Sequence, residues 1–316
     1  MKRREFFKDA GIFTCGCAFM AGCIGSTVKI KENIPPLFND WMSTLDREAK
    51  PGGSDWLPHI EFSLAYHCNL NCACCCHCSP IAPVSFMPLD IFEKDLDRIQ
   101  KITQGKVRHI ILLGGEPLLN KNVEEYLKLT RKYFNNSVII LLTNGLLLND
   151  MPDSFWRTCC SSNTIIHHAF YPLYEKYPDL APSYEKSTKY NVKIKSAGNP
   201  RYKFYQMLLS NKNTNDVEKR YKSCINKIKC AVIDNGIFYP CHVIFSANTF
   251  LNKKFKEFAL PVTEKDYVDI YKIKSLEKIL EFLKKPKDFC KYCHYSPKTK
   301  KLWTLSKGEA AEWFDV

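Results

Sequence analysis

The stretch His59–Pro80, which reads HIEFSLAYHCNLNCACCCHCSP, places six cysteines within eleven residues directly after a strand-like apolar run. Only Cys68, Cys72 and Cys75 follow the spacing C-x3-C-x2-C, because the same spacing started at Cys72 or Cys74 ends on a serine or an isoleucine. Soft thiolates on a short loop suit an iron–sulfur cluster or zinc. Three thiolates leave one iron of a [4Fe-4S] cluster without a protein ligand. The spacing therefore predicts a cluster that can bind a substrate or cofactor.

A second motif, GGEP at Gly114–Pro117, follows later in the chain. Together with CNLNCACC at residues 68–75, it resembles the motifs of radical S-adenosylmethionine (radical SAM) enzymes. In that superfamily the open iron binds the amino and carboxylate groups of SAM, and the GGE motif helps to hold its methionine part. The resemblance implies SAM cleavage, a low-potential electron donor, and a radical that removes a hydrogen atom from the substrate. It assigns cluster ligation and catalysis to Cys68, Cys72 and Cys75, and SAM binding to Gly114, Gly115, Glu116 and Thr143.

The longer string CNLNCACCCHCSPIAP also resembles a subgroup whose loops read roughly CNLNCxxCDHFSPLA and which is associated with cell-surface polysaccharide gene clusters. One departure is Cys74, which stands before the third ligand where the superfamily usually has an aromatic residue. Cys76 and Cys78 are further thiols without a counterpart. The subgroup leaves the substrate open between a glycan precursor and a peptide.

Strand-like and helix-like segments alternate after His59, which indicates an α/β fold with a parallel sheet and outer helices. The expected strands are 60–66, 107–113, 138–142, 164–169 and 192–195, and the expected helices are 89–102 and 123–134. For the resembled family this pattern implies a partial (β/α)6, TIM-like barrel. The cysteine loop, the GGE motif and Thr143-Asn144 each follow a strand, so we expect them to meet at the C-terminal rim.

A further strand is followed by His167, His168, Tyr171 and Pro172, which are either substrate contacts or a packed strand end. Cys159 and Cys160 lie in an expected helix and are predicted to be core residues.

The C-terminal part contains a second group of thiols. An Asp234-Asn235-Gly236 turn predicts a β-hairpin flanked by cysteines, and an amphipathic helix at about 275–284 precedes a C-x2-C pair. The arrangement resembles the twitch or SPASM extensions that hold auxiliary iron–sulfur clusters. We expect Cys241, Cys290 and Cys293 as ligands of an auxiliary [4Fe-4S] cluster, with Cys230 or Cys224 as the fourth; zinc held by four thiolates is the alternative.

The composition is that of a globular protein with an unusual cysteine content. The 316 residues carry a net charge of +13 and include 16 cysteines, whose short spacings favour metal binding over a disulfide framework. Most of the excess charge is scattered lysine without regular aromatic interleaving, so no nucleic-acid partner is predicted. The partners expected are a small-molecule or peptide substrate and an electron donor.

The N-terminus, MKRREFFKDAGIFTCGCAFMAGC, resembles a twin-arginine export signal with a degenerate lipobox ending at Cys23. Radical SAM chemistry is expected in the cytoplasm, so localisation stays open between export or membrane association and retention. The predicted organisation is a signal or anchor at 1–25, a linker at 26–58, a radical SAM barrel at 59–215 and an auxiliary extension at 216–316. Two rival functions are a SAM-independent iron–sulfur electron carrier and a zinc-stabilised binding module.

Overall fold

A computed structural model describes residues 54–172, 177–196, 203–206, 208–212, 216–224, 230–294 and 300–316. They belong to a compact unit that runs from Leu45 to Val316. The predicted N-terminal signal lies outside the described residues. Within the described ranges, the helices are too short or too polar for any of them to cross a membrane.

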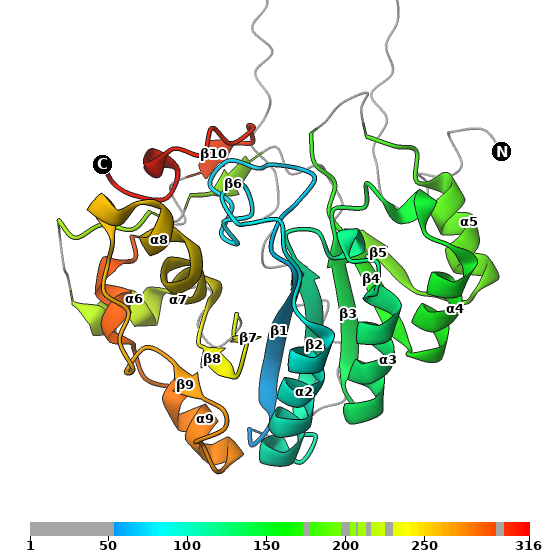
Figure 1. Ribbon diagram of the computed structural model, residues 1–316, viewed down its shortest axis with the longest axis horizontal. Helices are drawn as coiled ribbons and strands as arrows, with labels where there is room; N and C mark the ends of the chain where they lie inside the picture. The colour runs from blue at the N-terminus through cyan, green and yellow to red at the C-terminus, as the bar shows by residue number, and fades with distance from the viewer. Residues whose placement is uncertain are drawn as a thin grey trace, which may run out of the picture. The chain divides into compact units, whose positions relative to one another are not determined.

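The core of the fold is an open sheet whose first five strands are parallel and alternate with helices (Figure 1). The strands are β1 (Leu57–Ala65), β2 (Val107–Gly114), β3 (Val138–Thr143), β4 (Thr164–His168) and β5 (Ile194–Ser196), in the spatial order β5-β4-β3-β2-β1. The helices are α2 (Leu89–Thr103), α3 (Val123–Tyr133), α4 (Asp153–Ser161) and α5 (Ala181–Lys189). This arrangement confirms the predicted α/β class with an unclosed, barrel-type parallel sheet.

The sequence of helix α2 shows why this helix could be predicted. Its residues Phe92, Leu96 and Ile99 recur at helical spacing and are fully buried. Phe92 meets Phe62 of β1 edge-to-face, with ring centroids 5.0 Å apart. Burial of each such side chain stabilises the fold by about 1.5–3 kcal/mol. The helix ends at Gln104, which adopts the left-handed conformation (φ 52°).

The sheet continues past β1 with C-terminal strands. These are β7 (Val232–Asp234), β8 (Ile237–Tyr239) and β9 (Val268–Asp269). β7 runs parallel to β1, and the Glu61 N–H donates to Ala231 O at 2.8 Å. Asn235 and Gly236 have φ of 48° and 78°, which gives the tight turn predicted between two antiparallel strands. The hairpin therefore extends the barrel sheet from its β1 edge.

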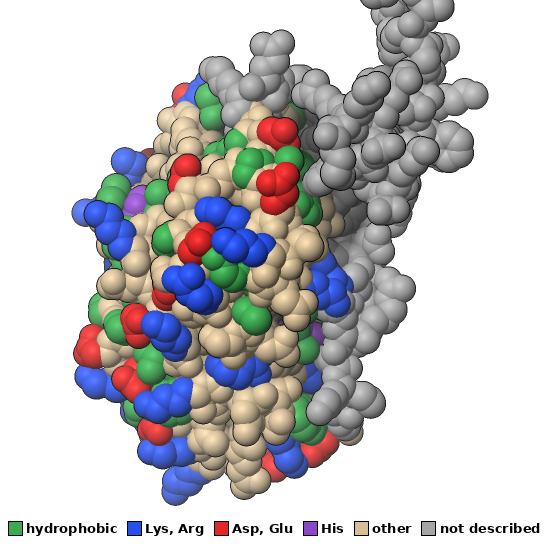
Figure 2. Space-filling view, turned by 90° about the vertical axis from the view of Figure 1, so that its right-hand side faces the viewer, with side chains coloured by type: hydrophobic (Ala, Val, Ile, Leu, Met, Phe, Trp, Pro, Cys, Tyr) green, Lys and Arg blue, Asp and Glu red, His purple; other side chains and the backbone are tan. Residues whose placement is uncertain are grey.

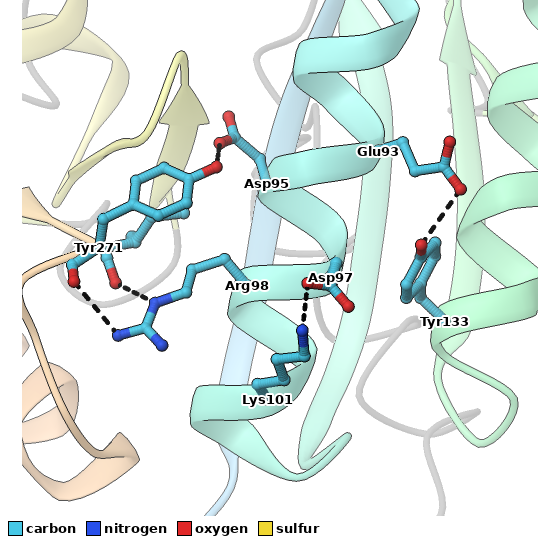
Figure 3. A network of polar contacts seen from close by, with 8 residues as sticks. Glu93, Asp95, Asp97, Arg98, Lys101, Tyr133 and Tyr271 are labelled. Carbon is cyan, nitrogen blue, oxygen red and sulfur yellow. Dashed lines mark hydrogen bonds and ion pairs between the residues drawn. The ribbon is translucent and has the colours of Figure 1, made fainter.

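Helix α2 also fastens this hairpin to the barrel by polar contacts (Figure 3). Arg98 donates to Ile270 O at 2.7 Å and to Ile273 O at 2.6 Å. Asp95 accepts from the Gly236 N–H at 3.0 Å and from the Tyr271 hydroxyl at 3.1 Å. Because Asp95 is buried, these bonds also compensate a carboxyl group removed from water.

A second apolar core contains Phe245, Phe289, Trp313 and Phe314. The remaining elements of the fold are short. The helices are α6 (Val217–Ser223), α7 (His242–Ser246), α8 (Asn252–Lys254) and α9 (Leu276–Leu283), with a π-helix η5 (Ala247–Leu251) between α7 and α8. The 3-10 helices are η2 (Pro117–Leu119), η3 (Leu148–Asp150), η6 (Lys256–Phe258), η7 (Asp288–Tyr292) and η8 (Ala310–Glu312). β6 (Lys203–Tyr205) and β10 (Lys300–Leu302) form a separate antiparallel pair.

Two surface observations bear on the sequence predictions. On the face in Figure 2, lysine and arginine side chains are interspersed with acidic ones rather than gathered in one patch. Cys159 on α4 is buried as predicted, but Cys160 is exposed, so its prediction as a core residue was wrong. The two thiols are neighbours in a helix and therefore point about 100° apart, which puts only one of them on the buried face.

Candidate functional site

The three predicted motifs lie together at the C-terminal ends of β1, β2 and β3. The Gly115 N–H donates to Ala65 O at 2.8 Å, and the Glu116 N–H donates to His67 O at 3.1 Å. From the end of β3, the Asn144 side chain donates to Asn69 Oδ1 at 2.7 Å and lies 3.6 Å from Cys68 Sγ. The cysteine loop, the GGE motif and the Thr143-Asn144 segment thus share one rim.

The two glycines allow the chain to pack against itself at this rim. A Cβ atom on Gly115 would lie 2.1 Å from His67 O, and one on Gly114, whose φ is +147°, would lie 2.1 Å from Ala65 O. Neither backbone carbonyl can move without breaking the bonds that it accepts. These positions therefore exclude a side chain because the GGE motif sits directly on the segment that leads into Cys68.

Glu116 ties the ends of β2 and β3 together. Its buried carboxylate accepts hydrogen bonds from the Leu118 N–H at 3.0 Å, the Thr143 hydroxyl at 2.7 Å and the Asn144 N–H at 2.8 Å. Burial raises the pKa of this carboxyl to about 7, and the three hydrogen bonds act in the opposite direction. The carboxylate oxygens of Glu116 thus bind residues of the protein itself at the ends of β2 and β3. The binding of SAM by Glu116 stays a prediction.

The three thiols predicted to hold the cluster lie on the loop that follows β1. Burial raises the pKa of the Cys68 thiol to about 12, and the nearby Glu116 and Cys75 raise it further. Burial also raises the pKa of the Cys75 thiol. Cys72 Sγ accepts a hydrogen bond from the indole Nε1 of Trp303 at 3.2 Å. A metal that binds here must therefore displace protons from thiols.

The donor set fits an iron–sulfur cluster by its chemistry. All thirteen cysteines in the described ranges are free thiols, and soft thiolates are the ligands such clusters prefer. Among the residues described, however, no three His, Cys, Asp or Glu side chains stand ready to hold a metal ion.

A C-terminal segment, residues 303–313, lies along the cysteine loop; we call it the strap. The Ala73 N–H donates to Thr304 O, and the Ser306 N–H donates to Asn71 O, both at 2.9 Å. The Cys74 N–H donates to Glu312 Oε2 at 3.1 Å. The loop backbone is left-handed at Asn71, Cys74 and Cys78 (φ 50–54°), a conformation that non-glycine residues adopt only where the surroundings hold them. The hydrogen bonds from the strap contribute to stabilising this loop conformation.

The extra thiols of the loop line a small, mainly apolar pocket. Its lining residues are Cys74, Cys76, Cys78, Leu209, Val243, Ser246, Leu251 and Trp313. Cys78 is buried, and burial raises the pKa of its thiol well above the usual value. The backbone N–H of Cys78 donates to Cys75 O at 3.0 Å, so this pocket lies next to one predicted ligand.

The C-terminal cysteines converge from four separate elements. Cys224 follows α6, Cys230 precedes β7, Cys241 is the residue before α7, and Cys290 lies in η7, which ends just before Cys293. Burial raises the pKa of the Cys241 thiol well above its usual value, and Cys290, Cys224 and Cys293 raise it further. The pKa of the Cys230 thiol is raised in the same way, by burial first and then by Glu61, Cys76, Cys241 and Cys224. Electrostatic effects thus link the predicted auxiliary ligands with one another, and Cys76 raises the pKa of Cys230 in the same way; the auxiliary cluster itself stays a prediction.

A family model for the Radical SAM superfamily matches residues 62–224, just over half of the chain. The chain belongs to the radical SAM superfamily. It is therefore an enzyme whose family implies a [4Fe-4S] cluster and SAM. The twitch or SPASM character of residues 216–316 and the boundaries of the predicted domains stay predictions.

Curated relatives match only part of this radical SAM chain. GTP 3',8-cyclase of Helicobacter pylori (strain HPAG1) is 31% identical over 101 residues, which cover 30% of this chain and 30% of that protein. The enzyme of the same name from Aliarcobacter butzleri (strain RM4018) is 30% identical over 97 residues, or 29% of each chain. The chain thus spans about 30% of the length of these relatives.

Solved radical SAM structures are also similar, at low identity. BtrN in complex with AdoMet and 2-DOIA is 16% identical with a TM-score of 0.48, covering 75% of this chain and 93% of that one. Native anSMEcpe with AdoMet and the Cp18Cys peptide is 21% identical with a TM-score of 0.34, covering 44% and 42%.

The structure also contains a buried polar row that sequence reasoning missed. His59, Glu61 and Ser63 alternate along β1 and are each at most 4% exposed. His242 Nε2 lies 2.7 Å from Glu61 Oε2, a close contact without the alignment of a full hydrogen bond, and its ring stacks on His77 with centroids 3.9 Å apart. Burial lowers the pKa of His242 to about 3, so its imidazole is neutral at pH 7, and burial raises the pKa of Glu61. The polar residues at every second position of β1 could have indicated this row, because alternate residues of a strand point to the same face of the sheet.

The two histidines at the end of β4 are packed into the protein. His167 and His168 are buried, and His168 Nε2 lies 2.7 Å from the Tyr184 hydroxyl. Burial lowers the pKa of His168 to about 4, so its imidazole is neutral at pH 7. Tyr171 lies near the strap, with its ring centroid 6.4 Å from that of Trp303. Packing at the end of the strand explains the burial of the two histidines, whereas the Tyr171 ring lies near Trp303, which contacts the cysteine loop.

Proposed function

We propose that this enzyme uses a [4Fe-4S] cluster held by Cys68, Cys72 and Cys75 to cleave SAM and abstract a hydrogen atom from a glycan precursor or a peptide. The observation that carries the proposal is the convergence of the three-thiol loop with the GGE motif and Asn144 at the ends of three adjacent parallel strands. When bound, the reduced cluster supplies one electron to SAM, which yields methionine and a 5'-deoxyadenosyl radical.

The proposed role of the protein's own residues is to bind and orient the cluster and SAM. Cys68, Cys72 and Cys75 would hold three irons as thiolates, and Gly114 and Gly115 would help to bind the methionine part of SAM. Glu116 keeps β2 and β3 in register, and Asn144 holds the first turn of the cysteine loop through Asn69. A shift of any of these elements would move the thiols relative to the cofactor.

We further propose that the C-terminal thiols hold an auxiliary [4Fe-4S] cluster. Cys241, Cys290 and Cys293 are the core of this set, with Cys230 or Cys224 as the fourth ligand. The proposal is supported by the electrostatic effect of Cys290, Cys224 and Cys293 on the Cys241 thiol, each of which raises its pKa. Tetrahedral zinc would use the same donors, so metal content decides between them.

The decisive experiment is 5'-deoxyadenosine formation from SAM by anaerobically reconstituted, dithionite-reduced protein, measured by mass spectrometry. A variant with Cys68, Cys72 and Cys75 all changed to Ala should form none and should lose about four irons per chain while it keeps the auxiliary metal. Cys160→Ala is the matched control, because that thiol is exposed on α4; it should behave as the unchanged protein.

Two results would overturn the proposal. If the triple variant binds as much iron as the unchanged protein, these thiols are not the ligands. If fully iron-loaded protein cleaves no SAM, with or without candidate glycans and peptides, it is an electron carrier. Tightly bound zinc and no iron at either site would instead indicate a structural binding module.

A further inference from the structure

The strap brings a polar hydrogen atom directly onto one predicted cluster ligand. The indole Nε1–H of Trp303 donates to Cys72 Sγ at 3.2 Å, a normal length for a hydrogen bond to sulfur. The two residues are 231 positions apart in the chain. An indole N–H is a donor only, so it cannot exchange roles with the sulfur.

The backbone around both partners fixes this contact. Cys72 and Leu305 form an antiparallel bridge. On either side of Trp303, β10 pairs with β6, and Thr304 O accepts from the Ala73 N–H at 2.9 Å. The indole is thus held by a short antiparallel ladder rather than by a mobile side chain on the surface.

We propose that Trp303 is a positioning residue that donates a hydrogen bond to the Cys72 thiolate of the SAM-cleaving cluster and raises the reduction potential of that cluster. The inference rests on the proposed function. Reduction adds one electron, supplied by an external low-potential donor, and increases the negative charge on the iron and sulfur atoms. A donated N–H stabilises the more negative state, which makes the cluster easier to reduce.

The chain offers a matched control in a second indole of the strap. Trp313 Nε1 donates to Cys75 O at 2.8 Å, so it supports the same loop through a backbone carbonyl and not through a thiolate. Trp303→Phe and Trp313→Phe each remove one indole donor from the strap. Only the first removes a hydrogen bond to a ligand atom.

The test is a redox titration of the full-length, reconstituted protein, followed by electron paramagnetic resonance. In Trp303→Phe the midpoint potential of the signal that changes on SAM addition should move to a more negative value. In Trp313→Phe that potential should stay close to that of the unchanged protein. An unchanged midpoint in Trp303→Phe, or equal shifts in both variants, would overturn the inference.

Alkylation of the metal-free chain provides a second measurement if Trp303→Phe fails to load iron. Iodoacetamide labelling, read by peptide mass spectrometry, should differ in rate at Cys72 between Trp303→Phe and the unchanged protein, whereas the rate at Cys68 should not change. Equal Cys72 rates would refute the contact. Failure of the unchanged protein to bind iron or cleave SAM would instead remove the proposed function, and labelling would still report on the contact.

Discussion

Replacing Glu116 by glutamine should change the pH dependence of stability in a defined direction. The pKa of this buried carboxyl is about 7 in the folded protein against 4.5 for a solvated glutamate. A folded pKa above the unfolded one means that the folded state binds the proton more tightly. The associated stability is fully present below pH 4.5 and is lost as pH rises through 7. At 1.36 kcal/mol per pKa unit, the loss is about 3 kcal/mol.

The glutamine side chain of the Glu116→Gln variant is neutral at every pH and does not contribute this loss. It does forfeit at least one accepted hydrogen bond. Its amide nitrogen replaces either Oε2, which accepts from the Asn144 N–H, or Oε1, which accepts from the Leu118 N–H and the Thr143 hydroxyl. A buried donor left without its acceptor costs about 1–3 kcal/mol. We therefore expect Glu116→Gln to be less stable than the unchanged protein at about pH 4.5, and the difference to shrink by about 3 kcal/mol, or to reverse, by about pH 8.

The assay is urea unfolding of metal-free, reduced protein between about pH 4.5 and about pH 8, followed by tryptophan fluorescence. Differences between the two proteins cancel the other titrating groups. Glu93→Gln is the control, since the partly exposed Glu93 carboxylate bonds Lys132 and Tyr133, and these hydrogen bonds lower its pKa. Its small effect should have the opposite sign and appear as pH falls. A pH-independent difference for Glu116→Gln would refute the reasoning.

Other contacts allow four more predictions. Gly115→Ala should lower the free energy of unfolding by about 3 kcal/mol or more and impair iron loading, because the new Cβ would meet His67 O. Gly105 is also left-handed but has open space around it, so Gly105→Ala should lower the free energy of unfolding by only about 1 kcal/mol. Equal urea midpoints for the two variants would contradict this. Cys241→Ala should remove the auxiliary metal and spare the SAM-cleaving iron, as read by metal analysis. Arg98→Met should lower the free energy of unfolding by about 2 kcal/mol through loss of its bonds to the 270–273 segment, whereas Lys94→Met on the same helix should be near neutral. If the N-terminus is a twin-arginine signal, changing Arg3 and Arg4 to Lys should shift tagged protein towards the cytoplasm on fractionation.

The parts of the fold that could be predicted from sequence are those encoded locally. The α2 boundary, the parallel strands and the turn at Asn235-Gly236 follow from side-chain periodicity and turn chemistry within a few residues. The meeting of the three motifs followed from one rule, that loops after parallel strands share a rim. The rule needs only the order of elements, not their contacts.

What sequence could not supply depends on long-range pairing. The hairpin attaches at the β1 edge through Glu61 and Val232, and no local pattern states which edge a distant strand will join. Trp303 carried no signal of its own, because its partner Cys72 lies far along the chain. Glu116 was predicted to bind SAM from its motif alone. That its carboxylate oxygens accept hydrogen bonds from Thr143 and Asn144 becomes evident only when β2 and β3 are placed side by side.

The strap has a consequence for how the protein is made. During synthesis the cysteine loop leaves the ribosome first, and Trp303 follows 231 residues after Cys72. Until then the loop lacks the strand against which Asn71 and Ala73 are bonded. Metal delivered to the nascent chain would meet thiols on an unsupported loop. The loop can therefore reach the conformation described here only after residues 303–313 have been synthesised.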